Sequence, residues 1–243
     1  MSTQSVKFIK SLQLKKFRKV HSCFFVEGKT NILEAINSNL KIKTLYLTKL
    51  GLEDINTFDF DGEIIELNEK QLIQAGTYKS NNYGLAVVEI PDFKTKDFVL
   101  CNEWALALDG VSDPGNLGTI IRTADWFGIN TIYCSHDTVD MYAPKVINST
   151  KGSFSRVKVI YTDLEEVLKN NDCYAAEMTG ESLYEVDWAK KKQGVILMGN
   201  ESHGVSKALS NLVNFSITIP KTGGAESLNV AVATSIICSY VTK

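Results

Sequence analysis

The 243-residue chain is long enough for one large domain or two small ones, and its 44% of hydrophobic residues is ordinary for a globular protein. A formal net charge of −2 argues against a protein that coats nucleic acid without regard to sequence. No apolar run approaches membrane-spanning length and the N-terminus has no signal-peptide core, so we expect a cytoplasmic protein without a membrane partner. The five scattered cysteines form no C-x-x-C pair, so no disulfide framework and no metal site are expected.

The first thirty residues carry most of the positive charge. They hold seven lysines and arginines against one glutamate, a sum of +6, and residues 6–17 have the pattern of an amphipathic helix. A basic helix can supply phosphate contacts without a basic protein, although a solvated helix face is an equally simple interpretation. The candidate phosphate contacts are Lys15, Lys16, Arg18 and Lys19.

The first part of the chain alternates short strands with helices, which predicts a small layered α/β domain at 1–92. A proline followed by mixed charges at 91–97 indicates a linker, which we place at 93–103. The predicted strands are 23–26, 44–47, 63–67 and 83–90, and the predicted helices after the first are 31–37 and 69–75, the last capped by Asn68.

The pattern restarts with a longer rhythm at 104–243, which predicts a second α/β domain with a mostly parallel sheet. Its last helix is expected to begin at Ser227, a favourable N-cap residue. The predicted strands are 104–108, 131–134, 157–161, 174–178, 195–198 and 217–219, and the other predicted helices are 116–127, 145–150, 164–169 (capped by Asp163) and 206–211.

Three glycine-containing turns, at 109–118, 199–204 and 220–229, follow predicted strands of the second domain. Loops at the carboxyl ends of parallel strands gather at one edge of the sheet and build ligand sites. The chain has no Walker motif, no G-x-G-x-x-G after a strand and no G-x-S-x-G, so neither a nucleotide triphosphatase, a standard dinucleotide fold nor a serine hydrolase is indicated. The turns and the helix after the first carry Asn116, Arg122, Asn200, Glu201, Ser227 and Asn229.

Three stretches, DGVSDPGNLGTIIRTADWFGI, ILMGNESHGVS and IPKTGGAESLNVAVAT, resemble the three motifs of the SpoU family in order and spacing. These are the TrmH-type RNA 2′-O-ribose methyltransferases of the SPOUT class. The resemblance implies a deep trefoil knot that threads the helix from Ser227, a homodimer formed through the knotted domain, and ribosomal RNA as substrate. Residues 1–92 resemble, more weakly, the ribosomal-protein-like RNA-binding domain of the family. Transfer RNA as substrate, a non-catalytic RNA-binding or ribosome-assembly factor, and a methyltransferase for a small molecule or protein remain alternatives.

The resemblance also implies a site for S-adenosylmethionine. An adenine needs an apolar slot with backbone donors and acceptors, and the family pattern places it at the turns that follow the strands. The residues it implies are Met178, Thr179, Gly180, Gly199, Asn200, Ile219, Ser227 and Leu228.

In the reaction a ribose 2′-oxygen attacks the sulfonium methyl, and the resemblance assigns Asn116, Arg122, Glu201, Ser227 and Asn229 to this step. The family mechanism proposes the arginine as base. Arginine is a very poor proton acceptor, so stabilisation of the developing alkoxide is the easier role for Arg122. Asn116 could instead cap a helix, and Glu201 is expected to anchor loops or Arg122.

Further RNA contacts are expected in the segment KVINSTKGSFSR. Asn148, Ser149 and Ser153 would lie on the RNA side, and Lys151 and Arg156 would hold phosphates. The alternative is a solvated turn.

Overall fold

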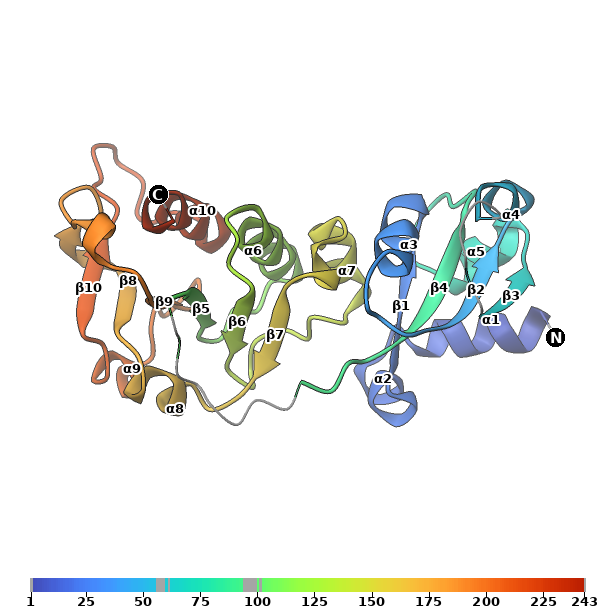
Figure 1. Cartoon of the computed structure of the whole chain (residues 1–243), viewed down its shortest axis with the longest axis horizontal. Coiled ribbons are helices and arrows are strands. Elements are labelled where there is room, and N and C mark those ends of the chain that lie inside the picture. Colours follow the sequence, from blue (N-terminus) through green and yellow to red (C-terminus); the bar gives the residue numbers. More distant parts are fainter. Residues whose placement is uncertain (1, 56–59, 61, 94–99, 101, 243) are drawn as a thin grey trace. The chain divides into compact units, whose positions relative to one another are not determined.

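The computed structural model describes residues 2–55, 60, 62–93, 100 and 102–242 (Figure 1). Most of the predicted linker at 93–103, including Cys101, lies outside the described residues. The chain divides into two compact units, each with its own sheet. Unit 1 comprises Met1–Asp92 with Asp140–Ser155, and unit 2 comprises Phe93–Val139 with Arg156–Lys243.

Unit 1 is built on a four-stranded sheet in the order β1-β4-β2-β3, in which β4 runs antiparallel to both neighbours and β2 pairs parallel with β3. Buried side chains of β1, β2 and β4 pack with Ile9 and Leu72 of the helices and with Leu12, which directly follows the first helix, to form its core. The strands are β1 (Cys23–Glu27), β2 (Ile42–Leu47), β3 (Glu63–Glu66) and β4 (Gly84–Glu89). The helices before β4 are α1 (Ser2–Ser11), α2 (Lys15–His21), α3 (Lys29–Ile36), α4 (Lys49–Ile55) and α5 (Glu69–Ala75).

Two helices, α1 and α2, replace the single helix predicted at 6–17, and α4 was not predicted. The predicted cap of α5 is confirmed. Asn68 accepts a hydrogen bond from Gln71 N at 3.0 Å, and the Gln71 side chain accepts one from Asn68 N at 2.9 Å. This reciprocal capping box satisfies two backbone donors that would otherwise have no partner at the helix start.

The segment 140–155 follows β6 in the sequence but packs within unit 1. It contains α7 (Pro144–Thr150) and a 3₁₀ turn (Ser153–Ser155). Asp140 accepts hydrogen bonds from buried Arg18 at 2.7 and 3.2 Å. The ring of Phe24 lies 4.7 Å from that of Tyr142 and 6.2 Å from that of Phe154, centroid to centroid. An ion pair and an aromatic cluster therefore join this segment to α2 and β1.

Unit 2 has a six-stranded, wholly parallel sheet in the order β10-β8-β9-β5-β6-β7, as the strand and helix alternation predicted. Helices α6 and α10 pack side by side (Figure 1), joined by a 3.0 Å hydrogen bond between Thr123 and Ser235. The strands are β5 (Trp104–Leu108), β6 (Thr131–Cys134), β7 (Lys158–Tyr161), β8 (Cys173–Ser182), β9 (Gly194–Met198) and β10 (Phe215–Thr218). The helices are α6 (Pro114–Trp126), α8 (Leu164–Lys169), α9 (Lys207–Ser210) and α10 (Val230–Val241), with a 3₁₀ turn at Trp188–Lys190.

Two predicted helix starts in unit 2 were wrong. Helix α6 begins at Pro114 rather than 116, because proline suits the first helical position and Asp113 accepts a hydrogen bond from Asn116 N at 2.9 Å. Asn116 is therefore inside the helix and not its cap. Helix α10 begins at Val230, and its cap is Asn229 rather than Ser227. Among the described residues, no helix has the length and apolar character needed to cross a membrane.

Candidate active site

The first two glycine turns follow β5 and β9, which are neighbours in the sheet. The chain leaves β5 toward β6 and β7 on one side, while β9 lies on the other side, so the two turns flank the point where the strand order reverses. Ligands bind at this position in open parallel sheets. The amide of Asn200 donates to Gly110 O at 2.6 Å, and Ser206 N donates to Asp109 Oδ2 at 2.7 Å. These contacts join the second turn to the first.

The side chain of Asn200 also folds its own turn. Its Oδ1 accepts from Ser202 N at 2.8 Å, while its backbone pairs in both directions with Gly204. A Cβ at Gly199 would lie 2.2 Å from the carbonyl carbon of Gly204, so this close approach requires glycine. Both ends of the Asn200 amide thus bind the protein itself, and its side chain organises the loops.

A chain of side-chain hydrogen bonds joins all three turns. Asn229 Nδ2 donates to Asn116 Oδ1 at 2.9 Å, and Asn116 Nδ2 donates to Glu201 Oε1 at 2.8 Å. Asn229 Oδ1 meanwhile accepts from the N–H groups of Ala231 and Val232 and so caps α10. The structure therefore brings together three predicted site residues, one from each turn. We call this the Asn229–Asn116–Glu201 chain.

Arg122 lies on α6 and is exposed. Within the part of the chain that the structure describes, its guanidinium forms no hydrogen bond and no ion pair. The other exposed arginine behaves differently: Arg156, predicted to contact phosphate, makes a two-pronged interaction with Asp125 at 2.9 and 3.0 Å. A guanidinium without an internal partner can bind a phosphate or stabilise an anion in its fixed fork geometry.

The third turn offers unpaired backbone groups. Residues 221–229, including Ser227, are all exposed, and none of the N–H groups from Lys221 to Leu228 is bonded within the described chain. Leu228 is 48% exposed and adds apolar surface. Backbone donors beside an exposed aliphatic side chain suit a planar, partly polar ligand such as adenine, so the predicted cofactor fits the chemistry of this turn.

The exposed stretch Met178–Gly180, also predicted to line the cofactor site, belongs to β8 and runs close to β10. Thr218 Oγ1 donates to Met178 O at 3.3 Å, and a Cβ on Gly180 would lie 2.5 Å from Ser216 O. Ile219 directly follows β10. A cavity of about 340 Å³ elsewhere in unit 2 is lined by Tyr174, Phe215, Lys191 and neighbouring residues, none of which was predicted as a site residue.

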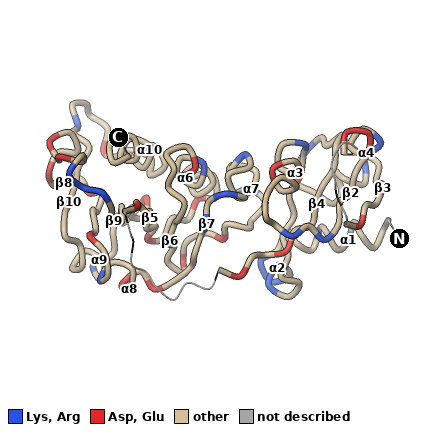
Figure 2. The backbone as a smooth tube through the Cα atoms, in the orientation of Figure 1, with Lys and Arg blue, Asp and Glu red and all other residues tan. Residues whose placement is uncertain are grey.

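The basic residues predicted to contact RNA in unit 1 differ in exposure. Lys15, Lys16 and Lys19 are exposed on α2, where Figure 2 shows basic residues gathered, and Lys151 is exposed after α7. Arg18 is only 3% exposed, and its guanidinium binds Asp140 and the carbonyls of Leu12 and Gln13. Arg18 therefore has no face left for a phosphate, and we assign it a structural role.

Comparison with known proteins agrees with this geometry. The model of the SpoU rRNA Methylase family matches residues 103–239, which contain all three turns. The chain belongs to the SpoU rRNA methylase family. A model of the MRM3-like substrate binding domain matches residues 3–86, within unit 1.

Some relatives of this SpoU protein span nearly its whole length. The 23S rRNA (guanosine(2553)-2′-O)-methyltransferase RlmP of Bacillus subtilis is 29% identical over 242 residues, covering 98% of this chain and 96% of the relative. A putative TrmH-family RNA methyltransferase from Porphyromonas gingivalis has a solved structure with a TM-score of 0.89 at 31% identity, covering 99% and 98% of the two chains. An AdoMet-bound rRNA methyltransferase from Sinorhizobium meliloti has a TM-score of 0.85 at 29% identity, covering 97% and 93%.

Proposed function

We propose that this SpoU protein is an S-adenosylmethionine-dependent methyltransferase acting on a ribose 2′-hydroxyl of ribosomal RNA. The observation that carries the proposal is the Asn229–Asn116–Glu201 chain, which draws the three motif turns together near the strand-order reversal. The 23S rRNA 2′-O-methyltransferase activity for which RlmP is named and the similarity to an rRNA methyltransferase from Sinorhizobium meliloti support this substrate over transfer RNA.

Bound S-adenosylmethionine supplies an electrophilic methyl group. The third turn would hold it through the unpaired N–H groups and Leu228, and Ser227 adds a hydroxyl at the same turn. Met178, Thr179, Gly180, Gly199 and Ile219 would complete its binding site from the ends of β8, β9 and β10.

Arg122 would bind the substrate beside the attacking oxygen and stabilise the negative charge that develops there. A guanidinium remains protonated in proteins, so we assign it no proton transfer. Asn116, Ser227 and Asn229 would orient the reacting groups by neutral hydrogen bonds, which gives the alignment that in-line methyl transfer needs. Glu201 accepts from Asn116 and so fixes the direction of that amide.

We further propose that the protein is a homodimer and that α10 is threaded through a trefoil knot. Residues 1–92 would bind RNA, and residues 104–243 would carry out the reaction, in the cytoplasm. Trp126 at the end of α6 is 83% exposed, and Val232 in the first turn of α10 is 48% exposed. A second subunit packed on α6 and α10 would cover them.

The test is methyl transfer from labelled S-adenosylmethionine to unmodified 23S rRNA and to unmodified transfer RNA, followed by digestion to nucleosides. We expect label on a ribose 2′-oxygen of the 23S rRNA alone. Label on a base or on transfer RNA would overturn the reaction or the substrate. A protein that binds the cofactor and the RNA yet transfers no methyl group would be a non-catalytic RNA-binding factor.

A further inference from the structure

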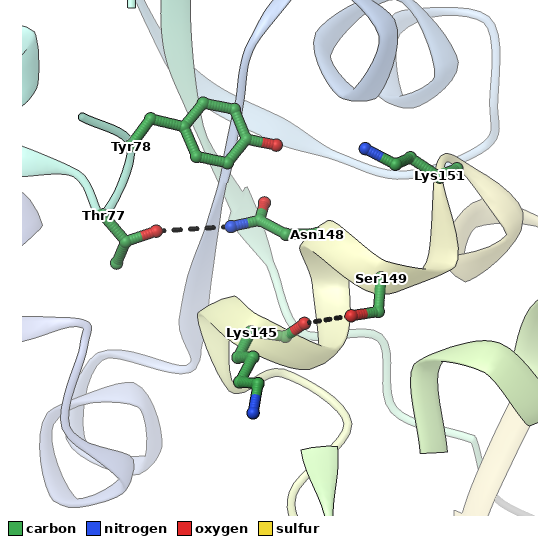
Figure 3. A pocket seen from close by; sticks show the side chains of 6 residues that line it. All are labelled: Thr77, Tyr78, Lys145, Asn148, Ser149 and Lys151. Carbon is green, nitrogen blue, oxygen red and sulfur yellow. Dashed lines mark hydrogen bonds between the residues drawn. The ribbon is translucent and has the colours of Figure 1, made fainter. Parts of the chain in front are cut away.

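A pocket of about 540 Å³ lies wholly within unit 1 and outside the three motif turns (Figure 3). Two of its lining residues, Thr77 and Tyr78, come from the turn after α5. The others come from α7 and the residue after it, and they are Lys145, Asn148, Ser149 and Lys151. One wall of the pocket therefore belongs to residues 3–86, which match the substrate binding domain, and the other wall belongs to the segment 140–155.

A buried carboxylate holds the two sides of the pocket together. Glu27, 1% exposed, accepts hydrogen bonds from Thr77 N at 2.9 Å, Tyr78 N at 3.3 Å and Asn148 Nδ2 at 3.0 Å, and also from the Thr77 hydroxyl. The turn passes so close that a Cβ on Gly76 would lie 2.3 Å from Glu27 Oε2. Buried polar groups that are bonded in this way fix the geometry around them, so the pocket is formed before any ligand arrives.

The same contacts orient the amide of Asn148. Asn148 Nδ2 donates to Glu27 Oε1, so the NH₂ group faces Glu27, and it also donates to Thr77 Oγ1 at 3.2 Å. The Asn148 carbonyl oxygen is then turned away from Glu27, toward the side of the pocket where Tyr78 lies (Figure 3). It gives the pocket one fixed acceptor among groups that mostly donate.

The remaining walls are basic and aromatic. Lys145 and Lys151 are exposed, and in Figure 3 their side chains extend to different sides of Asn148, that of Lys151 toward the hydroxyl of Tyr78. The Tyr78 ring is half-buried and packs over Gly28, where a Cβ would lie 3.1 Å from Tyr78 Cε2. Burial raises the pKa of Tyr78, and the charge of Glu27 adds to this, so the phenol stays a neutral donor.

We propose that this pocket binds one nucleotide of the substrate RNA, with the flanking phosphates on Lys145 and Lys151 and the nucleoside against Tyr78 and the Asn148 carbonyl. The proposal rests on the proposed RNA substrate and adds a binding site built from other residues than those of the three motif turns. Two cations match the phosphates on either side of a nucleoside, aromatic side chains stack on unpaired bases, and a fixed acceptor can receive a base N–H or a ribose hydroxyl. An acidic peptide would use the lysines but leave the aromatic ring and the acceptor without a role.

The experiment measures binding of the full-length protein to unmodified 23S rRNA over a range of salt concentrations. Lys145→Gln with Lys151→Gln should weaken binding and reduce the slope of log K against log salt by about 1.4, since each phosphate of single-stranded RNA contributes about 0.7. The matched control is Lys49→Gln with Lys70→Gln, which removes two exposed charges of unit 1 outside the pocket. It should change the slope much less. Both proteins should bind S-adenosylmethionine as the wild type does.

The nucleoside contact is tested separately at Tyr78. Tyr78→Leu should weaken RNA binding without changing the salt slope, whereas Tyr78→Phe retains the ring and should bind nearly as tightly as wild type. Wild-type affinity and slope in the double lysine variant would overturn the proposal, even where the wild type methylates RNA. A wild type that binds RNA but transfers no methyl group would overturn the proposed reaction and leave this site standing.

Discussion

The side-chain amide of Asn116 donates a hydrogen bond to the carboxylate of Glu201 at 2.8 Å, although 85 positions separate them in the chain. The same amide accepts from Asn229 at 2.9 Å. One small side chain therefore uses its donor and its acceptor in opposite directions, which neither a carboxylate nor an ammonium group can do. The three turns of the site depend on this single orientation.

Exchanging the groups of the Asn116–Glu201 pair tests this orientation. Asn116→Asp removes the donor and places two carboxylates within hydrogen-bond distance, so we expect methyl transfer to fall about tenfold to a hundredfold through misplacement of the reacting groups. Adding Glu201→Gln supplies an N–H to the new carboxylate and should recover much of the rate. Initial rates on 23S rRNA give the result. A doubly substituted protein as slow as the two single effects multiplied would show that the pair does not act as a unit.

Asn229 has two tasks that can be separated. Asn229→Asp keeps an oxygen for the N–H groups of Ala231 and Val232 but loses the donor to Asn116. It should therefore retain the stability of α10 while slowing methyl transfer. Asn229→Ala loses both functions and should cost about 1 kcal/mol of stability as well. Urea denaturation and initial rates measure the two effects, and equal stability losses in both variants would contradict the assigned cap.

Local patterns in the sequence predicted much of the fold correctly. The Asn68 capping box and the Asp163 cap are encoded within a few residues, and the strand and helix alternation predicted the parallel sheet of unit 2. The motif turns predicted Asn116, Glu201 and Asn229 as site residues, and the three side chains lie in one hydrogen-bonded chain. The start of α10 was misjudged because Ser227 and Asn229 are both good caps, and the choice depends on the tertiary contact with Asn116.

Local sequence patterns do not predict contacts between residues that lie far apart in the chain. The run K-K-F-R-K looks uniformly exposed, yet Arg18 is buried. Its guanidinium donates hydrogen bonds to Asp140, which lies 122 positions further along the chain. For the same reason, local patterns do not predict that 140–155 packs on α2 and β1. Deleting residues 1–92 would leave Tyr142 and Phe154 without Phe24, so single substitutions test the domain roles more cleanly than truncation.

Arg18 should contribute to stability. Its side chain is 4% exposed and that of Asp140 is 16% exposed, so Arg18→Ala leaves a largely buried carboxylate without its partner. We expect a loss of about 3 kcal/mol, whereas Lys19→Ala on the same helix should change stability by less than about 0.5 kcal/mol. Arg18→Met with Asp140→Leu removes both charges and should recover part of the loss. Urea denaturation provides the values, and similar results for Arg18→Ala and Lys19→Ala would refute the structural role.

Three of the four buried cysteines in the described part of the chain, Cys134, Cys173 and Cys238, should resist alkylation. Burial raises the pKa of Cys173 and of Cys238 from 9.0 to about 12, and that of Cys134 further. The thiolate is the reactive form, so iodoacetamide at pH 8 should label these residues far more slowly in the native protein than in urea. Peptide mass spectrometry resolves the sites. Native labelling at the rate seen in urea would contradict the burial of these thiols.

The same thiols determine whether the free energy of unfolding rises or falls at alkaline pH. The folded state holds these protons more tightly than the unfolded state, so their contribution is complete below pH 9 and is lost as the pH rises from 9 toward about 12. The free energy of unfolding should therefore fall over this range. Cys238→Ala should make the fall shallower, and an unchanged curve in this variant would exclude a contribution from Cys238.

Arg122 should matter for the reaction and little for the fold. It is exposed and has no partner within the described chain, so Arg122→Ala should leave the melting temperature and cofactor binding unchanged. Loss of a group that stabilises transition-state charge typically lowers kcat by about a hundredfold to a thousandfold. Lys169→Ala, which removes an exposed cation paired with Glu165, is the matched control and should be nearly silent.

Arg122→Lys separates the two roles available to this residue. A lysine that stabilises charge works only while protonated, so methyl transfer by Arg122→Lys should decline relative to wild type as the pH approaches about 10. A lysine acting as base would do the reverse and gain rate as it loses its proton. The ratio of variant to wild-type rates between about pH 7 and about pH 10 distinguishes these outcomes. A rising ratio would assign proton transfer to this position and overturn the electrostatic role.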